Sequence, residues 1–217
     1  MCSTSDFVEL LLWPALAAHL MRHAPGLDLT THVMVEDIAG ALANGSYDLC
    51  IAPPNSAPDH VSMRRRILFD ERFVCLVRRG HPALDRKLTP KRFAALEHAL
   101  ISPLGRAGGV VDTALAELGL TRRVRILTQH FLVAPFVVAR TDLVLTMPER
   151  TARELARHVG LEMITPPIEL PTFQVVMLWH ERSHDDPAHA WLRDAVAGVA
   201  AASAPRSARS QPKRPAR

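Results

Sequence analysis

The sequence predicts an α/β protein made of two units, and three observations lead to this fold class. Helical and strand patterns alternate with short connections from residue 8 to residue 52. A second alternation of the same style runs from residue 93 to residue 164. Two long β-type runs, Ser62 to Val77 and Phe173 to His180, follow the first and second units respectively. Such alternation is typical of strands joined through helices, so we expect a mostly parallel sheet flanked by helices in each unit.

The first helix is predicted over Val8 to Arg22, with Ser5 or Asp6 as its N-cap and Pro25-Gly26 as its end. One helical face collects the apolar side chains Val8, Leu11, Leu12, Ala15 and Leu16. Pro14 interrupts the pattern, because proline removes a backbone donor and crowds the preceding turn. We therefore expect Pro14 to kink the helix or to begin a second segment.

Three further elements complete the first unit. A strand is predicted over Leu27 to Val35, and a short helix over Asp37 to Asn44 with Gly45 as its stop. The continuous apolar run from Tyr47 to Ala52 predicts a strand that is buried on both faces.

The second unit repeats the order of strand, loop and helix. Its predicted helices are Phe93 to Glu97, Gly109 to Leu118, Phe131 to Ala139 and Arg150 to His158. Its predicted strands are His98 to Ile101, Val124 to Leu127, Leu143 to Met147 and Leu161 to Ile164. A last amphipathic helix, Pro187 to Ala201, closes the folded part and offers Ala190, Trp191, Ala195, Val196 and Val199 for burial.

The composition is that of a globular protein with a sizeable core: 217 residues, 48% hydrophobic and 22% charged. The net charge of +4 belongs to the tail from Ser203 to Arg217, which carries five basic residues and no acid. Without these five, the rest of the chain has 21 basic and 22 acidic residues. It therefore has no excess positive charge that would bind a nucleic acid. Prolines and small polar residues predict that tail residues 203–217 are disordered.

Cysteine content and hydropathy argue against a disulfide-rich protein, a thiolate zinc protein and a membrane-spanning protein. Cys2, Cys50 and Cys75 are odd in number and far apart, so neither a disulfide framework nor a thiolate zinc site is predicted. No apolar run approaches the ~18–20 residues of a membrane span, and the start of the chain lacks the basic region of a secretory signal. We expect a cytoplasmic protein that does not contact a membrane.

Candidate binding residues lie where predicted strands meet helix starts, since backbone N–H groups converge there in doubly wound sheets. These positions are Ser5-Asp6, Ser102 to Gly105, Thr128 to Phe131, and Thr146 to Pro148. Each position alone is equally explained by ordinary capping and turn chemistry. The four together predict one shared binding edge.

Motifs for catalysis or for a cofactor are not found. Gly105 to Gly109 lacks the glycine spacing of a dinucleotide site and the lysine of a phosphate loop. The pairs His19/His23 and His180/His184 have a spacing that suits a metal, but neither pair has a convincing third ligand. We predict no metal, no cofactor and no enzymatic activity, because no acid, base or nucleophile is held by a recognisable partner.

Short motifs along nearly the whole chain resemble the effector-binding domain of LysR-type transcriptional regulators. They are Ser5-Asp6-Phe7 leading into Leu10 to Leu16, Ala24-Pro25-Gly26, Gly45 to Leu49, Leu68 to Cys75, Arg79 to Pro82, Leu178-Trp179-His180, and Asp186 to Arg193. Each motif is unspecific, but their order and spacing over residues 3–200 are specific.

The resemblance implies a fold like that of type 2 periplasmic binding proteins, with two Rossmann-like subdomains joined by two crossover strands. Residues 1–75 and 180–202 would form the first subdomain, and residues 76–179 the second. A small-molecule effector, aromatic or carboxylate in character, would bind in the cleft between them. Carried over by position, its contacts would be Ser5, Asp6, Pro53, Ser102, Gly105, His130, Phe131 and Thr146.

The resemblance also implies assembly and partners. A side-by-side homodimer would place the first helix against the partner's second subdomain, with Leu10, Leu11, Leu12 and Trp13 as interface candidates. For each of these four residues, burial in the chain's own core is the alternative. A full-length regulator would form a dimer or a tetramer.

The chain departs from the family pattern in two places. Family members contact DNA through an amino-terminal winged helix-turn-helix, which these residues do not include, so we expect this chain alone not to recognise a promoter. The strand before Ser5 is reduced to Met1 to Thr4, which is expected to weaken the first sheet and destabilise this subdomain, or to leave the edge of its cleft open. The alternative function is a solute-binding protein of the same fold, which an export signal would distinguish.

Overall fold

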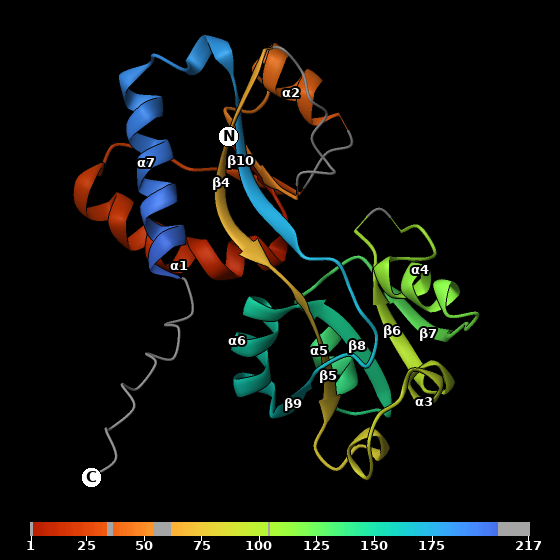
Figure 1. Cartoon of the computed structure of the whole chain (residues 1–217). Coiled ribbons are helices and arrows are strands. Elements are labelled where there is room, and N and C mark those ends of the chain that lie inside the picture. The colour runs from red at the N-terminus through yellow and green to blue at the C-terminus, as the bar shows by residue number, and fades with distance from the viewer. Residues whose placement is uncertain (1, 34–36, 54–61, 104, 204–217) are drawn as a thin grey trace, which may run out of the picture.

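The computed structural model describes residues 2–33, 37–53, 62–103 and 105–203, and it contains two five-stranded sheets that lie in separate subdomains (Figure 1). The first sheet has the strand order β2-β1-β3-β10-β4, and the second has the order β7-β6-β8-β5-β9. The two-unit α/β class and the pair of long connecting β runs are therefore confirmed. The predicted basic tail, apart from Ser203, lies outside the described residues.

The first subdomain is built from strands β1 (Cys2–Thr4), β2 (Thr31–Val33), β3 (Leu49–Ala52), β4 (Met63–Glu71) and β10 (Phe173–His180). Its helices are α1 (Asp6–His23), α2 (Ile38–Asn44) and α7 (Pro187–Ala202), with a short 3-10 turn η3 (Glu181–Ser183) before α7. Gly45 ends α2 in the left-handed conformation at φ +82°, as the sequence predicted.

The second subdomain contains strands β5 (Phe73–Arg78), β6 (Glu97–Ile101), β7 (Arg123–Thr128), β8 (Leu143–Pro148) and β9 (Leu161–Ile164). Its helices are α3 (Pro90–Ala95), α4 (Val110–Glu117), α5 (Ala134–Val138) and α6 (Glu149–Val159), with a 3-10 turn η2 (Pro82–Leu84). Two helices differ from the prediction. Helix α3 begins earlier because Thr89 caps it and Pro90 suits its first turn, and α5 is shorter because residues 131–133 form a turn.

Helix α1 runs as one helix through Pro14, so no second segment begins there. Its buried side is formed by Phe7, Val8, Leu12, Leu16 and Leu20, which recur at helical spacing. Pro14 is exposed, so the break in the hydrogen-bond ladder faces solvent and leaves the packed side continuous.

Both sheets mix parallel and antiparallel pairs, which corrects the expectation of mostly parallel sheets. β1 pairs in parallel with β2 and β3, and β6 pairs in parallel with β7 and β8. The crossover strands supply the antiparallel pairs: β10 lies between β3 and β4, and β5 lies between β8 and β9. Strands β5 and β10 each enter their sheet from the other subdomain, and each is antiparallel to both of its neighbours there.

The crossovers divide the chain at positions that differ from the expected subdomain limits. β4 ends at Glu71 in the first sheet, and β5 begins at Phe73 in the second. β10 belongs to the first sheet along its whole length, although residues 173–179 were expected in the second subdomain. The second change of sheet therefore falls between Ile164 and Phe173.

Strand β1 is short, yet it occupies an inner position of the first sheet. Cys2 pairs with Thr31 on one side and with Leu49 on the other. The first sheet is thus continuous across the position where the shortened strand was expected to weaken it.

Helices cover both faces of each sheet, and a core lies on every covered face. In the first subdomain, α1 and α7 enclose a core with Leu12, Ile51 and Met177, and α2 covers the opposite face. In the second, α5 and α6 cover one face and α3 and α4 the other. The carboxyl ends of β6 and β8 are left facing the first subdomain (Figure 1).

Candidate functional site

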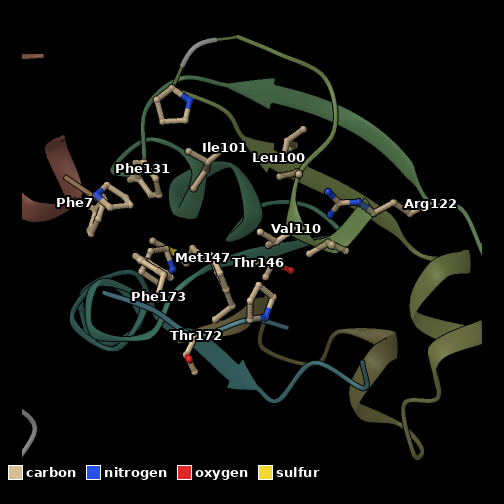
Figure 2. A pocket seen from close by; sticks show the side chains of 18 residues that line it. Phe7, Leu100, Ile101, Val110, Arg122, Phe131, Thr146, Met147, Thr172 and Phe173 are labelled. Atoms are coloured by element: carbon tan, nitrogen blue, oxygen red, sulfur yellow. The ribbon is translucent and has the colours of Figure 1, made fainter. Parts of the chain in front are cut away.

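A cavity of about 410 Å³ lies between the two subdomains (Figure 2). Its wall contains side chains from both subdomains and from both crossover connections. The lining residues are Phe7, Pro53, Phe73, Ala99, Leu100, Ile101, Pro103, Gly109, Val110, Val111, Arg122, Phe131, Thr146, Met147, Pro148, Pro171, Thr172 and Phe173.

The order of strands and helices determines which residues line the cavity. Ile101 and Met147 lie at the carboxyl ends of the neighbouring strands β6 and β8, and Val110 begins α4. Phe7 comes from the first turn of α1, in the opposite subdomain. The cavity therefore occupies the edge where strand ends and helix starts meet, which is where open α/β sheets bind their ligands.

Four phenylalanines of the wall form two pairs that connect the subdomains. The rings of Phe7 and Phe131 have centroids 4.8 Å apart and are tilted by 50°. The rings of Phe73 and Phe173, from β5 and β10, have centroids 5.1 Å apart and are tilted by 36°. Both geometries are favourable for aromatic pairs, so the two contacts stabilise the present arrangement of the subdomains.

Arg122 lies at the opposite side of the cavity wall from Phe7 in the view of Figure 2, and its side chain is only 1% exposed. Its Nε donates to Oδ1 of Asp112 at 2.8 Å, and its Nη2 donates to Oδ2 at 2.7 Å. The hydrogen bonds from Arg122 lower the pKa of the Asp112 carboxyl, which stays ionised.

His98 lies on the other side of the Arg122 guanidinium, with 3.4 Å between His98 Nδ1 and Arg122 Nη1. His98 Nε2 is 2.9 Å from the Phe93 carbonyl oxygen, so the imidazole donates there and accepts from Arg122. Burial lowers the pKa of His98 to about 4, which keeps the ring neutral near pH 7. The ionised pair Arg122–Asp112 is thus accompanied by a neutral histidine.

The remaining polar groups of the wall are few. Thr146 Oγ1 lies 3.2 Å from Sγ of Cys75. Burial raises the pKa of the Cys75 thiol to about 12, so it is not a reactive thiolate. In the part of the chain that the structure describes, no group of three or more His, Cys, Asp or Glu side chains is arranged to hold a metal ion.

Several contacts beside the cavity hold the start of α6 to the first subdomain. Glu71 is 4% exposed, and its carboxylate accepts from the backbone N–H groups of Arg72, Glu149 and Arg150. Burial nevertheless raises its pKa above the usual value. Thr151 Oγ1 donates to the Phe7 carbonyl oxygen at 3.5 Å, which adds a direct link to α1.

Three of the eight residues expected in the cleft line the cavity: Pro53, Phe131 and Thr146. Ser102 is buried next to the lining residues Ile101 and Pro103, and its N–H donates to the Thr128 carbonyl oxygen at 2.8 Å.

The other four expected contacts have different positions. Asp6 joins the subdomains, since its Oδ2 accepts from the Leu132 N–H at 3.1 Å. The Ser5 hydroxyl is buried without a hydrogen-bond partner among the described residues, and it does not line the cavity. Gly105 lies outside the lining at φ +69°, and His130 is exposed.

Sequence reasoning missed the crossover aromatics Phe73 and Phe173 and the buried Arg122. Phe173 is the first residue of one long β run, and Phe73 lies within the other, Ser62 to Val77. Because both runs were expected to cross between the subdomains, their aromatic residues were the available signal. Arg122 lies in a loop between a helix and a strand, and nothing in its local sequence distinguishes it from an exposed arginine.

The four candidate interface residues of α1 have different environments. Leu12 is fully buried in the core of its own subdomain, so it offers no surface to a partner. Trp13 is half-buried against the same core. Leu10 and Leu11 line a groove of about 640 Å³ between α1 and α6, together with Pro14, Ala15 and residues of α6.

Comparison with known proteins gives one consistent result. The family model for the LysR substrate binding domain matches residues 2–201. The HTH-type transcriptional regulator SyrM of Rhizobium meliloti is 36% identical over 196 residues, which are 90% of this chain and 60% of that protein. The HTH-type transcriptional activator NahR of Pseudomonas putida is 32% identical over 193 residues, which are 87% of this chain and 63% of NahR.

Solved structures give the same fold. A probable transcriptional regulator of Pseudomonas aeruginosa matches with a TM-score of 0.81 and 30% identity, over 91% of this chain and 65% of that one. The regulatory domain of MexT, a transcriptional activator in Pseudomonas aeruginosa, matches with a TM-score of 0.77 and 28% identity, over 91% of this chain and 96% of that domain. The chain spans about three fifths of the length of the curated relatives above. Those relatives are regulators of transcription, which agrees with the expectation that the chain is not an enzyme.

Proposed function

Because this chain belongs to the LysR substrate-binding domain family, we propose that it is the ligand-sensing part of a bacterial transcriptional regulator. Its partner is a small-molecule effector that binds in the cavity between the subdomains. Contact with DNA is made through an amino-terminal domain of the longer regulator, and the protein acts in the cytoplasm, where the DNA lies. Within the described residues, no helix combines the length and the apolar character needed to traverse a bilayer.

The observation that carries this proposal is the composition of the cavity wall. Phe7 and Pro53 belong to the first subdomain, whereas Ile101 and Val110 belong to the second. A ligand in this cavity contacts both subdomains at once and binds more tightly to the arrangement that closes around it. Its binding energy then favours one relative orientation, which is the signal that a regulator passes to its other domains.

The test is native mass spectrometry of the chain after incubation with a small-metabolite extract, compared with Val110→Trp. Val110 is at the cavity rim and 36% exposed, so an indole there fills space without entering the packed core. We expect a bound mass on the unmodified chain that Val110→Trp loses. The matched control is Leu118→Trp, at the exposed end of the same helix and outside the cavity wall. Equal retention of the bound mass by both variants would refute binding in this cavity.

We further propose that the chain forms a side-by-side homodimer through the groove between α1 and α6. Ala15 is exposed in this groove, which Leu10 and Leu11 also line. The proposed interface would desolvate a carboxylate introduced at Ala15, so Ala15→Glu is expected to shift the dimer to monomer in sedimentation. Ala116→Glu, on an exposed side of α4, is the control for the same substitution outside the groove. A dimer that survives Ala15→Glu unchanged contradicts this interface.

A further inference from the structure

The cavity wall consists almost entirely of uncharged groups. Two pairs of phenylalanine rings and several aliphatic side chains and prolines form most of it, and Thr146 and Thr172 contribute hydroxyls (Figure 2). Among the described residues that line the cavity, Arg122 is the one with a charged side chain. The charge preference of the site therefore depends on whether the Arg122 guanidinium is available to a ligand.

The Arg122 charge is already neutralised within the protein. Two of its nitrogens donate to the two carboxylate oxygens of Asp112, at 2.8 and 2.7 Å, in the geometry of a bidentate pair. The third nitrogen lies against His98, which accepts and carries no charge. The unit of Arg122, Asp112 and His98 has a net charge of zero, so it offers an anion hydrogen bonds at most and no unpaired cation.

The helix starts beside the cavity are neutralised in the same way. Helices α1, α4 and α6 place Phe7, Val110 and Pro148, respectively, in the cavity wall at their amino-terminal ends. A helix start favours negative charge, and each of these already has a carboxylate of the chain beside it. Asp6 and Asp112 lie in the first turns of α1 and α4. Glu71 accepts from two N–H groups at the start of α6.

An ionised ligand would therefore lose its hydration in this cavity without gaining an opposite charge. Moving a carboxylate from water into such surroundings is costly, whereas moving an aromatic ring out of water is favourable. The phenylalanine pairs offer ring faces and edges that suit stacked or edge-to-face contacts.

We propose that the cavity selects an uncharged aromatic effector and discriminates against an ionised carboxylate of the same shape. This rests on the proposed function, because it assigns a ligand class to the same cavity. The volume of about 410 Å³ lies near the lower end of the ~300–1,000 Å³ of small-molecule sites, so a ligand of two linked or fused rings suits it.

Two probes of equal shape test the charge preference: biphenyl-para-carboxamide and biphenyl-para-carboxylate, titrated into the whole chain by calorimetry at neutral pH. We expect the amide to bind at least about ten-fold more tightly than the carboxylate, since the site holds no uncompensated cation. Val110→Lys places a free ammonium at the exposed rim of the cavity, and it should reduce or reverse this preference. Leu118→Lys adds the same charge at the far end of α4 and should leave the preference unchanged.

Tighter or equal binding of the carboxylate by the unmodified chain overturns the ligand class while leaving the cavity as a binding site. A preference for the amide that Val110→Lys leaves intact also overturns it, because the discrimination then does not arise from the charge of the cavity wall. Failure of both probes to bind overturns the ligand class but not the proposed function, which the metabolite extract and the comparison of Val110→Trp with Leu118→Trp test separately.

Discussion

Replacing Asp112 by alanine removes the carboxylate that neutralises Arg122, whose side chain is 1% exposed. The guanidinium then remains buried without its counter-charge, and two hydrogen bonds of 2.8 and 2.7 Å are lost. His98, on the other side, is neutral and cannot take over the role of a counter-ion.

Breaking a buried ion pair from one side costs about 3–5 kcal/mol. The Asp112 side chain is 32% exposed, so water can enter the vacated space, and we expect the lower end, about 3 kcal/mol. Arg122→Met keeps apolar volume and leaves Asp112 able to hydrate, so its cost is about 1.5–3 kcal/mol, the value of a lost charged hydrogen bond. The double variant should cost about 2 kcal/mol less than the sum, because neither charge is then left alone.

Urea unfolding of the four proteins of this cycle gives each free energy of unfolding, provided that the slope with urea is unchanged. The control is the exposed pair of Arg66 and Asp194, where Asp194→Ala should change stability by no more than about 0.5 kcal/mol. The coupling between Asp112 and Arg122 is refuted if the double variant loses the sum of the two single losses in free energy of unfolding, to within about 0.5 kcal/mol. Arg122 would then not be neutralised at the cavity wall.

Three further predictions concern the core, the pH response and a helix end. Leu12→Ala should cost about 3–5 kcal/mol in urea unfolding at any protein concentration, since Leu12 is 0% exposed; a cost that fades on dilution would place it in an interface instead. Stability should fall by up to about 3 kcal/mol as the pH is lowered from 6.5 to about 4, because the unfolded state binds a proton at His98 that the folded state excludes. His98→Gln should lack this part of the slope, and an identical pH profile would disprove the assignment. Gly160→Ala should cost about 1 kcal/mol by thermal unfolding, because φ is +75° and a Cβ meets no neighbour, so an unchanged melting temperature would contradict it.

Much of the fold could be predicted because its signals are local. Apolar spacing predicted α1, and the glycine stop predicted the end of α2. The two long β runs were also evident, since a run of β-type residues is visible without its partner. Strand lengths were less certain: the strand predicted over Leu27 to Val35 begins only at Thr31. The pairing of those runs was not, because β10 meets β3 and β4 from more than a hundred residues away and runs against both.

The cavity residues also divide into those that the sequence predicted and those that depend on the tertiary structure. Phe131 and Thr146, which the rule that ligands meet strand ends and helix starts selected, line the cavity, and so does Pro53, which the family resemblance suggested. His130, next to Phe131, is exposed, because neighbouring residues in a turn point in different directions. A rule for positions along the chain therefore identifies the edge of the sheet and leaves the direction of each side chain open.

The sequence by itself determined the α/β class, the two units and the family to which the chain is similar, because periodicity and motif order are properties of neighbouring residues. Only the tertiary structure decided what faces the cavity. Phe73 meets Phe173 across a hundred residues, and Arg122 meets both Asp112 and His98. Whether a charge is free or neutralised depends on distance in space, so the electrostatic character of the site became visible only after the chain was folded.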